Sequence, residues 1–138
     1  MKGRARAGAA DAGRVFESCA ALAHHALGDL TGICLLDHAL AGRGQSGQLR
    51  AKQIACWLRA LGWLEAGQRT PVTVEHAHGQ WLTVIPVEET DGTLLGAFCV
   101  QQRVAQRVAQ STRYAANLTQ CLRPVLDCLH REHGAARP

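Results

Sequence analysis

Three blocks of the chain carry apolar residues at the spacing of one helical face. The first covers residues 14–27 and is followed by Gly28, at the position that glycine favours just beyond a helix. The second covers residues 49–64, and the third covers residues 103–133. Pro124 interrupts the third block, so the pattern predicts a kink or a break into two helices just before it.

Four other segments show the short apolar runs or the alternation that is typical of strands: residues 31–38, 71–76, 80–87 and 93–101. Turn signals separate the last three of them, and the second turn is built on Asp91-Gly92. These three segments are therefore expected to form an antiparallel meander. Pro86 predicts that its strand frays or bulges. The glycine-rich residues 39–48 are expected to form a loop or a weak edge strand.

This order of helices and strands predicts an α+β fold. An antiparallel sheet would carry helices on one face, with the middle helix and loops partly covering the other face. Residues 1–13, rich in Ala, Gly and basic residues, are expected to be a flexible tail. Residues 14–133 would form a single domain, and residues 134–138 a tail or a linker to a downstream output domain.

Composition narrows the class of protein. The chain has 138 residues, of which 47% are apolar and 19% charged, so it is not a disordered chain, a collagen or a coiled-coil rod. No run of 18 apolar residues is present, so no membrane partner is expected. The net charge of +4 comes from scattered arginines, which speaks against nucleic-acid binding. No secretory signal precedes the first helix, and we expect a cytoplasmic location.

The chemistry-bearing residues do not form a familiar catalytic motif. The six cysteines at positions 19, 34, 56, 99, 121 and 128 lie in apolar segments, and no Cys-x-x-Cys pair occurs. Such thiols are expected to be small core residues in a reducing compartment. The aspartates are spread along the chain without pairing at a shared strand end. The sequence therefore identifies no catalytic residue and no cofactor.

Two segments give the chain a resemblance to the GAF domains of the PAS/GAF sensory superfamily. Residues 32–37 (GICLLD) are similar to the first strand of that family, and residues 92–100 (GTLLGAFCV) to its closing strand. The resemblance covers residues 14–132 in element order. It implies an antiparallel sheet with the N- and C-terminal helices on one face and a middle helix and loops on the other. Residues 39–48 depart from the family, which usually has a clear second strand there.

The resemblance also implies a function. GAF-like domains are sensory or regulatory input domains of bacterial signalling proteins. Residues 122–132 are similar to the linker that precedes cyclic di-GMP synthase or phosphodiesterase domains. The chain is thus expected to control cyclic di-GMP turnover, with a small ligand shifting the packing of the terminal helices. Any catalysis would belong to a downstream domain, so the chain itself is not expected to be an enzyme.

In a GAF-like fold the middle helix and the sheet bound a ligand cavity. The candidate lining residues are Cys34, Leu36, Arg43, Trp57, Trp81, Thr83 and Cys99. Trp57 and Trp81 could stack on a planar ligand, and Arg43 could gate the cavity. The alternative is ordinary core filling for the two tryptophans and a flexible loop around Arg43.

A second group of candidates concerns a dimer interface. Four apolar residues of the last helix step by 4, 3 and 4, the spacing of a two-helix seam: Leu118, Leu122, Val125 and Leu129. The resemblance implies that such a helix can pair with a second subunit, and a homodimer is expected. The alternative is that this stripe only covers its own sheet.

Two other functions remain open from the sequence. One is a ligand-free dimerisation or docking module. The other is a redox or metal sensor that uses Cys34, Cys99, His76 or His78. No spacing fixes a third ligand beside the His-x-His pair, so a metal site is not expected. Cys34 and Cys99 lie in apolar runs without positive neighbours, which favours inert core packing.

Overall fold

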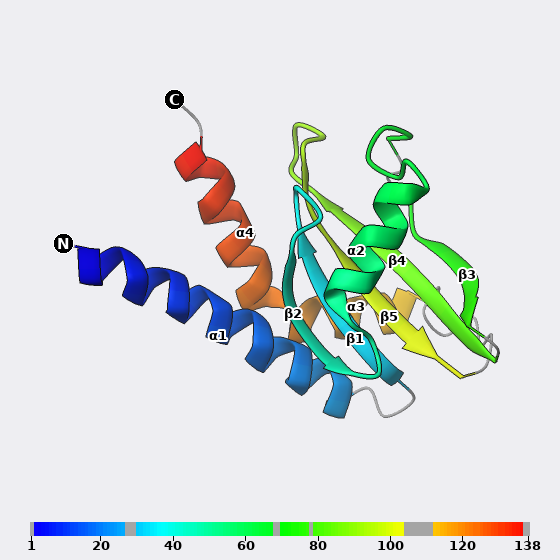
Figure 1. The fold of residues 1–138 in the computed structure, drawn as a ribbon. Helices are drawn as coiled ribbons and strands as arrows, with labels where there is room; N and C mark the ends of the chain where they lie inside the picture. The colour runs from blue at the N-terminus through cyan, green and yellow to red at the C-terminus, as the bar shows by residue number, and fades with distance from the viewer. Residues whose placement is uncertain (1, 27–29, 68–69, 78, 104–111, 137–138) are drawn as a thin grey trace.

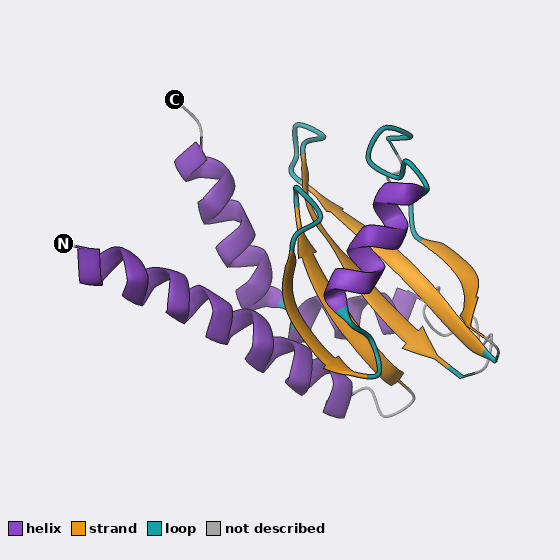
Figure 2. Ribbon diagram, in the orientation of Figure 1, coloured by secondary structure: helices purple, strands orange, loops and turns teal. Residues whose placement is uncertain are grey.

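The protein is built on one five-stranded antiparallel sheet (Figures 1 and 2). The computed structural model describes residues 2–26, 30–67, 70–77, 79–103 and 112–136. The strands are β1 (Leu30–Asp37), β2 (Gly42–Gly47), β3 (Val72–Ala77), β4 (Gln80–Glu88) and β5 (Leu94–Gln102), arranged in the order β2-β1-β5-β4-β3. The expected meander is confirmed as β3-β4-β5, and β5 then pairs with β1.

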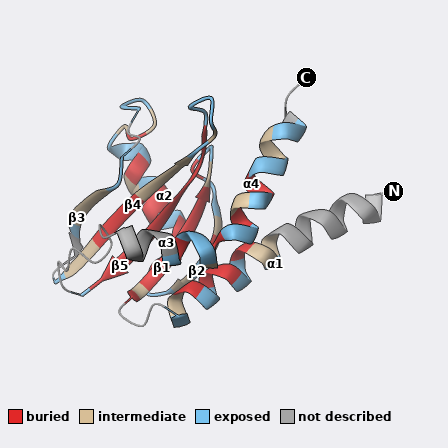
Figure 3. Ribbon diagram, turned by 180° about the vertical axis from the view of Figure 1, so that it is seen from behind, coloured by how far each residue is buried: buried red, intermediate tan, exposed pale blue. Residues whose placement is uncertain are grey.

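Helices cover both faces of the sheet. The face that carries most of the helices packs against α1 (Lys2–Ala26), α3 (Thr112–Cys121) and α4 (Arg123–Ala136), and the opposite face packs against α2 (Ala51–Ala60) (Figure 1). We call these the three-helix face and the α2 face. Alternation along the central strands supplies both cores, because successive side chains point to opposite faces. β1 and β5 are buried along nearly their whole length (Figure 3). The predicted α+β class, with terminal helices opposite the middle helix, is confirmed at this level.

The glycine-rich segment is an edge strand, one of the two alternatives left open. Its glycines let other elements approach closely. A Cβ placed at Gly44 would lie 2.9 Å from the backbone of Phe16 in α1, and one at Gly42 would lie 2.7 Å from the Cβ of Ala51 in α2. Gly47 has a φ of +77°, which L side chains rarely adopt. The segment lacks apolar alternation because the helices packed against Gly42 and Gly44 leave no room for larger side chains at these two positions.

The helices differ from expectation at their ends. α1 begins at Lys2, so residues 2–13, predicted to be a flexible tail, are helical. They lack an apolar stripe, but their alanines have the highest helix propensity. α2 ends at Ala60 instead of near residue 64, because the chain then turns through Gly62 with φ +67°.

The sequence left open a kink or a break near Pro124, and the structure has a break. α3 ends at Cys121 and α4 begins at Arg123, one residue before Pro124. Proline has no N–H to donate to the preceding turn, and its ring crowds that turn. The first part of this block, residues 104–111, lies outside the described residues. In the part of the chain that the structure describes, no helix is both long and apolar enough to cross a membrane.

The close approach of α1 to β2 gives a first prediction. Gly44→Ala should lower the free energy of unfolding by about 1–3 kcal/mol, because the new methyl group must displace the backbone of Phe16. Gly13→Ala is the matched control, since among the described residues no atom outside its own helix backbone lies within 4 Å of the added Cβ. That change should instead stabilise the protein by roughly 0.5–1 kcal/mol through helix propensity. Urea unfolding measures both, and equal effects of the two changes would contradict the close approach.

Candidate functional site

One arginine ties together four elements at the end of β1. The guanidinium of Arg43, in β2, donates two hydrogen bonds to the carboxylate of Glu132 in α4, at 2.9 and 2.6 Å. It also lies 3.5 Å from a carboxylate oxygen of Asp37 in β1 and 4.5 Å from the ring centroid of Phe16 in α1. The hydrogen bonds to Glu132 are the main cause that raises the pKa of Arg43. This arginine cluster joins α1 and α4 to the sheet.

The loop after β1 holds Asp37 in position. One carboxylate oxygen of Asp37 accepts hydrogen bonds from the backbone N–H groups of Ala39 and Ala41, both at 3.0 Å, and the other oxygen faces Arg43. Leu40 adopts a φ of +59°, unusual for a residue other than glycine, and its side chain is buried. Arg59 of α2 donates to the carbonyl groups of Ala39 and Leu40. The loop is therefore fixed from both faces of the sheet.

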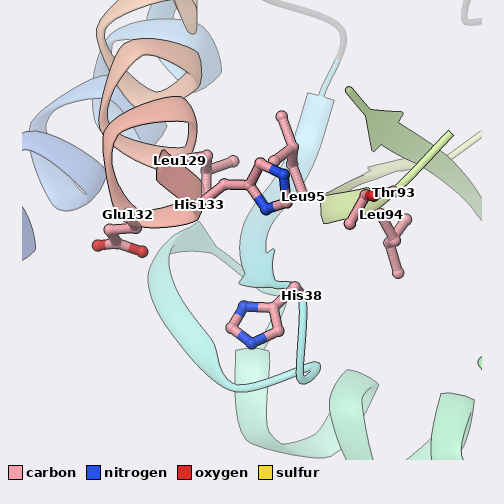
Figure 4. A pocket seen from close by; sticks show the side chains of 7 residues that line it. All are labelled: His38, Thr93, Leu94, Leu95, Leu129, Glu132 and His133. Carbon is pink, nitrogen blue, oxygen red and sulfur yellow. The ribbon is translucent and has the colours of Figure 1, made fainter. Parts of the chain in front are cut away.

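A small cavity lies next to the arginine cluster (Figure 4). Its volume is about 200 Å³, and its lining combines buried leucines of β5 and α4 with His38, Thr93, Glu132 and His133. His130, one residue after the lining residue Leu129 in α4, has its ring Nδ1 2.8 Å from the carboxylate of Glu89. Pockets for drug-sized ligands usually measure about 300–1,000 Å³. At about 200 Å³, this cavity is smaller than that range.

The seven predicted pocket residues do not come together. Cys34, Leu36 and Cys99 are fully buried in the core under α2, where the half-buried Trp57 packs against the same core. Alternation along β4 places Trp81 and Thr83 on the opposite face from Leu82, which belongs to that core. Thr83 is buried and shares a hydrogen bond of 2.9 Å with Thr73 of β3. The candidates are thus divided between the two faces of the sheet.

The side chain of Arg43 is held by ion pairs and does not stand at the mouth of a cavity between α2 and the sheet. It lines an open groove of about 590 Å³ beside β2, but its guanidinium is held by Glu132 and Asp37. Sequence reasoning missed both carboxylates and Phe16. Glu132 lies 89 residues from Arg43 in the chain, and no local pattern connects them. Only the packing of α4 beside β2 brings the pair together.

The four predicted interface residues are buried in the monomer. Leu118, Leu122, Val125 and Leu129 are each at most 3% exposed and belong to the core of the three-helix face. This placement fits the alternative in which the stripe covers its own sheet. An interface through these residues would require the helix to leave the sheet.

The residues of the predicted redox or metal sensor differ in burial and in position. Cys34 and Cys99 lie opposite each other on β1 and β5, and both are fully buried. A hydrogen bond with Cys34 and burial raise the pKa of the Cys99 thiol well above its usual value. His78 lies outside the described residues, and His76 lies in β3. Among the described side chains, no group of three or more His, Cys, Asp or Glu residues is placed to hold a metal ion.

The arginine cluster gives a prediction about stability. Arg43→Met should lower the free energy of unfolding by about 1–3 kcal/mol, because it leaves the carboxylates of Glu132 and Asp37 without their charged donor. Arg50→Met, an exposed change on the neighbouring loop, is the matched control and should cost less than about 0.5 kcal/mol. Thermal and urea unfolding of both variants test the difference. If Arg43→Met leaves the free energy of unfolding unchanged, the arginine cluster does not stabilise the packing of the helices.

Comparison with known proteins identifies the fold. No protein-family model and no curated protein sequence matches the chain. MglB from Myxococcus xanthus has a similar structure, with a TM-score of 0.50 and 14% sequence identity over 88% of this chain and 91% of that one. A Roadblock/LC7 domain from Streptomyces avermitilis gives a TM-score of 0.49 and 20% identity over 71% of this chain and 86% of that one.

The likeness to MglB corrects the predicted family. The GAF assignment, and with it control of cyclic di-GMP turnover, is wrong, because the structural likeness is to MglB. The assignment depended on residues 32–37 and 92–100, which form most of β1 and β5. These central strands are buried on both faces, and any sheet covered on both sides requires such apolar runs there. They specify a position in a sheet and no particular family, and the fold of this chain is that of MglB.

Proposed function

We propose that this chain is a non-catalytic regulatory adaptor domain that forms a homodimer and binds a partner protein. The likeness of its fold to MglB supports an adaptor over a sensory domain. The proposal keeps the dimer expected from the sequence and assigns it to a different surface. The surface is the free edge of β3 together with the neighbouring end of α2.

The free edge of β3 is the observation that carries the proposal. Among the described strands, β3 pairs only with β4, so the backbone groups on its other side have no strand partner. Residues 72–74 read Val-Thr-Val, a sequence with high β-propensity. An edge strand of this kind is a ready template for pairing with another chain. The other edge strand, β2, is rich in glycine and less suited to such pairing.

Apolar side chains at and beyond the end of α2 supply the hydrophobic part of the proposed interface. Leu61, the residue that follows α2, is 62% exposed, and Trp57 and Leu64 near it are half-buried. Leu64 and Trp57 pack against the same core as Val74 of β3. The ribbon views show the end of α2 near the start of β3 (Figures 1 and 3). Antiparallel pairing of two β3 strands about a two-fold axis would join the sheets and bring the two α2 helices together.

The partner protein that we propose is a small GTPase. This part of the proposal depends on analogy of fold with MglB, and no described cavity or residue cluster carries it. A GTPase presents different surfaces when it carries GDP and when it carries GTP. An adaptor that responds to the GTPase would bind these two surfaces with different affinity. Differential binding is what allows a nucleotide to control an assembly.

The dimer has a direct test with an internal control. Leu61→Asp places a charge in the proposed interface and should convert the dimer to a monomer, because burying an unpaired carboxylate opposes association. Leu22→Asp is the matched control, since Leu22 is 55% exposed on α1, away from β3. Sedimentation equilibrium measures the mass of each protein. A monomeric parent protein, or a dimer that tolerates Leu61→Asp, would contradict the proposed interface.

The partner class has a separate test. The purified protein should bind a small GTPase of the same organism with different affinity when the GTPase carries GDP or a non-hydrolysable GTP analogue. Isothermal titration calorimetry with both forms measures the difference, and a several-fold change in Kd is expected. Absence of binding in both states would refute the GTPase while leaving the dimer test unaffected.

A further inference from the structure

The small cavity beside the arginine cluster lies where three separate parts of the chain meet (Figure 4). Its apolar wall consists of buried leucines at the start of β5 and in α4. Its polar groups come from the β1–β2 loop, the β4–β5 turn and the second half of α4. In the close-up view the ring of His133 extends from α4 toward Thr93 and Leu95. Parts of the chain that are far apart in the sequence therefore enclose one space.

The size of the cavity limits the size of its ligand. Its volume of about 200 Å³ is somewhat larger than the ~150 Å³ of an engineered apolar cavity that binds benzene. A molecule of about five to eight non-hydrogen atoms therefore fits, whereas a nucleotide is too large. The leucine wall favours a molecule with a short hydrocarbon chain, and the polar groups favour one with a single polar end.

The charged groups around the cavity decide the sign of that polar end. Among the described residues that line it, Glu132 has the only carboxylate, and there is no lysine or arginine. Arg43 binds Glu132 from outside the lining and also faces Asp37, so this cluster has two carboxylates for one guanidinium and keeps a negative charge in excess. A cation in the cavity would compensate that charge, and an anion would add to it.

The lining also offers hydrogen-bond acceptors. Each carboxylate oxygen of Glu132 accepts one hydrogen bond from Arg43, at 2.9 and 2.6 Å, and each has a second lone pair. The hydroxyl group of Thr93 can accept a hydrogen bond, and so can one nitrogen of a neutral imidazole at His38. An ammonium group has three N–H donors and no acceptor. It therefore matches a lining that contains a carboxylate better than an anionic group does.

The loop that carries His38 is fixed by hydrogen bonds on both sides. Asp37 accepts hydrogen bonds from two backbone N–H groups of the loop, both at 3.0 Å, and Arg59 of α2 donates to two of its carbonyl groups. Leu40 has a φ of +59°, a costly conformation that persists only where the surroundings hold it, and such positions cluster at binding sites. The loop is thus arranged before a ligand enters, which lowers the entropy cost of binding.

We propose that this cavity binds a small alkylammonium ion, with the hydrocarbon chain against the leucines and the charge beside Glu132. The chemistry required is a primary ammonium on a chain of about four carbons, which fits the volume of the cavity. A free amine or a lysine side chain of another protein can supply it. The inference does not depend on the proposed adaptor function, because β5, α4 and the β1–β2 loop lie outside the proposed dimer interface.

The experiment compares three ligands that share a butyl chain and differ in charge: n-butylammonium, n-butanol and pentanoate. Each is titrated into the full chain at about pH 8, where an alkylammonium ion keeps its charge. Proton–nitrogen correlation spectra locate the site and give Kd. We expect n-butylammonium to shift the signals of Leu95 and His133 with a Kd of roughly 1–10 mM, and the other two ligands to bind several-fold more weakly. If pentanoate or n-butanol binds as tightly, or if no ligand shifts these signals, the proposal is overturned.

Two pairs of variants test the groups that line the cavity. Glu132→Gln keeps the shape of the side chain without its charge and should weaken n-butylammonium binding several-fold, whereas Glu17→Gln, an exposed change on α1, should not. His38→Ala should also weaken binding, and His25→Ala, exposed on α1, should not. Far-UV circular dichroism checks that each variant is folded, and the exposed His38 keeps the test valid if Glu132→Gln unfolds the protein. An unchanged Kd in both cavity variants would show that the ammonium group binds elsewhere.

A further ligand distinguishes the two sources of the ammonium group. Acetyl-lysine methylamide carries the same charged chain on a peptide backbone. If it binds as tightly as n-butylammonium, the cavity accepts a lysine side chain of another protein. If only n-butylammonium binds, the ligand is a free amine.

Discussion

The arrangement of the three-helix face depends on the guanidinium of Arg43. A partly buried cation is costly unless it is paired and hydrogen-bonded. Glu132 supplies two hydrogen bonds, Asp37 a second carboxylate and Phe16 an aromatic ring, each from a different element. The requirement to satisfy one charge therefore fixes where α1 and α4 lie relative to β1 and β2. The loop that positions Asp37 extends this constraint to α2 through Arg59.

The glycines of β2 make this arrangement possible. Gly44 lets the backbone of α1 approach the strand closely, which places the ring of Phe16 beside Arg43. The β2 side of the molecule is thus closed by helices and charge pairs. On the β3 side, no other described strand pairs with the outer edge of β3, and Leu61 is exposed just beyond the end of α2. This asymmetry between the two edges is why the adaptor surface is proposed at β3.

The family and the candidate site show where sequence reasoning stops. Element order and apolar runs describe β1 and β5 well, yet the same runs occur wherever a central strand is covered on both faces. The division of the predicted pocket residues between the two faces has a related cause. Trp81 and Thr83 share a strand with Leu82 but point away from it, and a shift of one residue decides the face. Long-range packing decides which face of β4 lies against α2, and the local sequence pattern carries no information about it.

The sequence by itself determined the α+β class, the β3-β4-β5 meander and an interruption of the last helical block near Pro124, because periodicity, turn residues and the missing proline N–H act over a few neighbouring residues. Whether that interruption is a kink or a break was left open. The sequence also left residues 39–48 undecided between loop and strand. Only the tertiary structure decided the pairing of Arg43 with Glu132 and, among the described strands, the unpaired edge of β3. These features join or expose residues far apart in the chain, and their positions follow from the packing of whole elements.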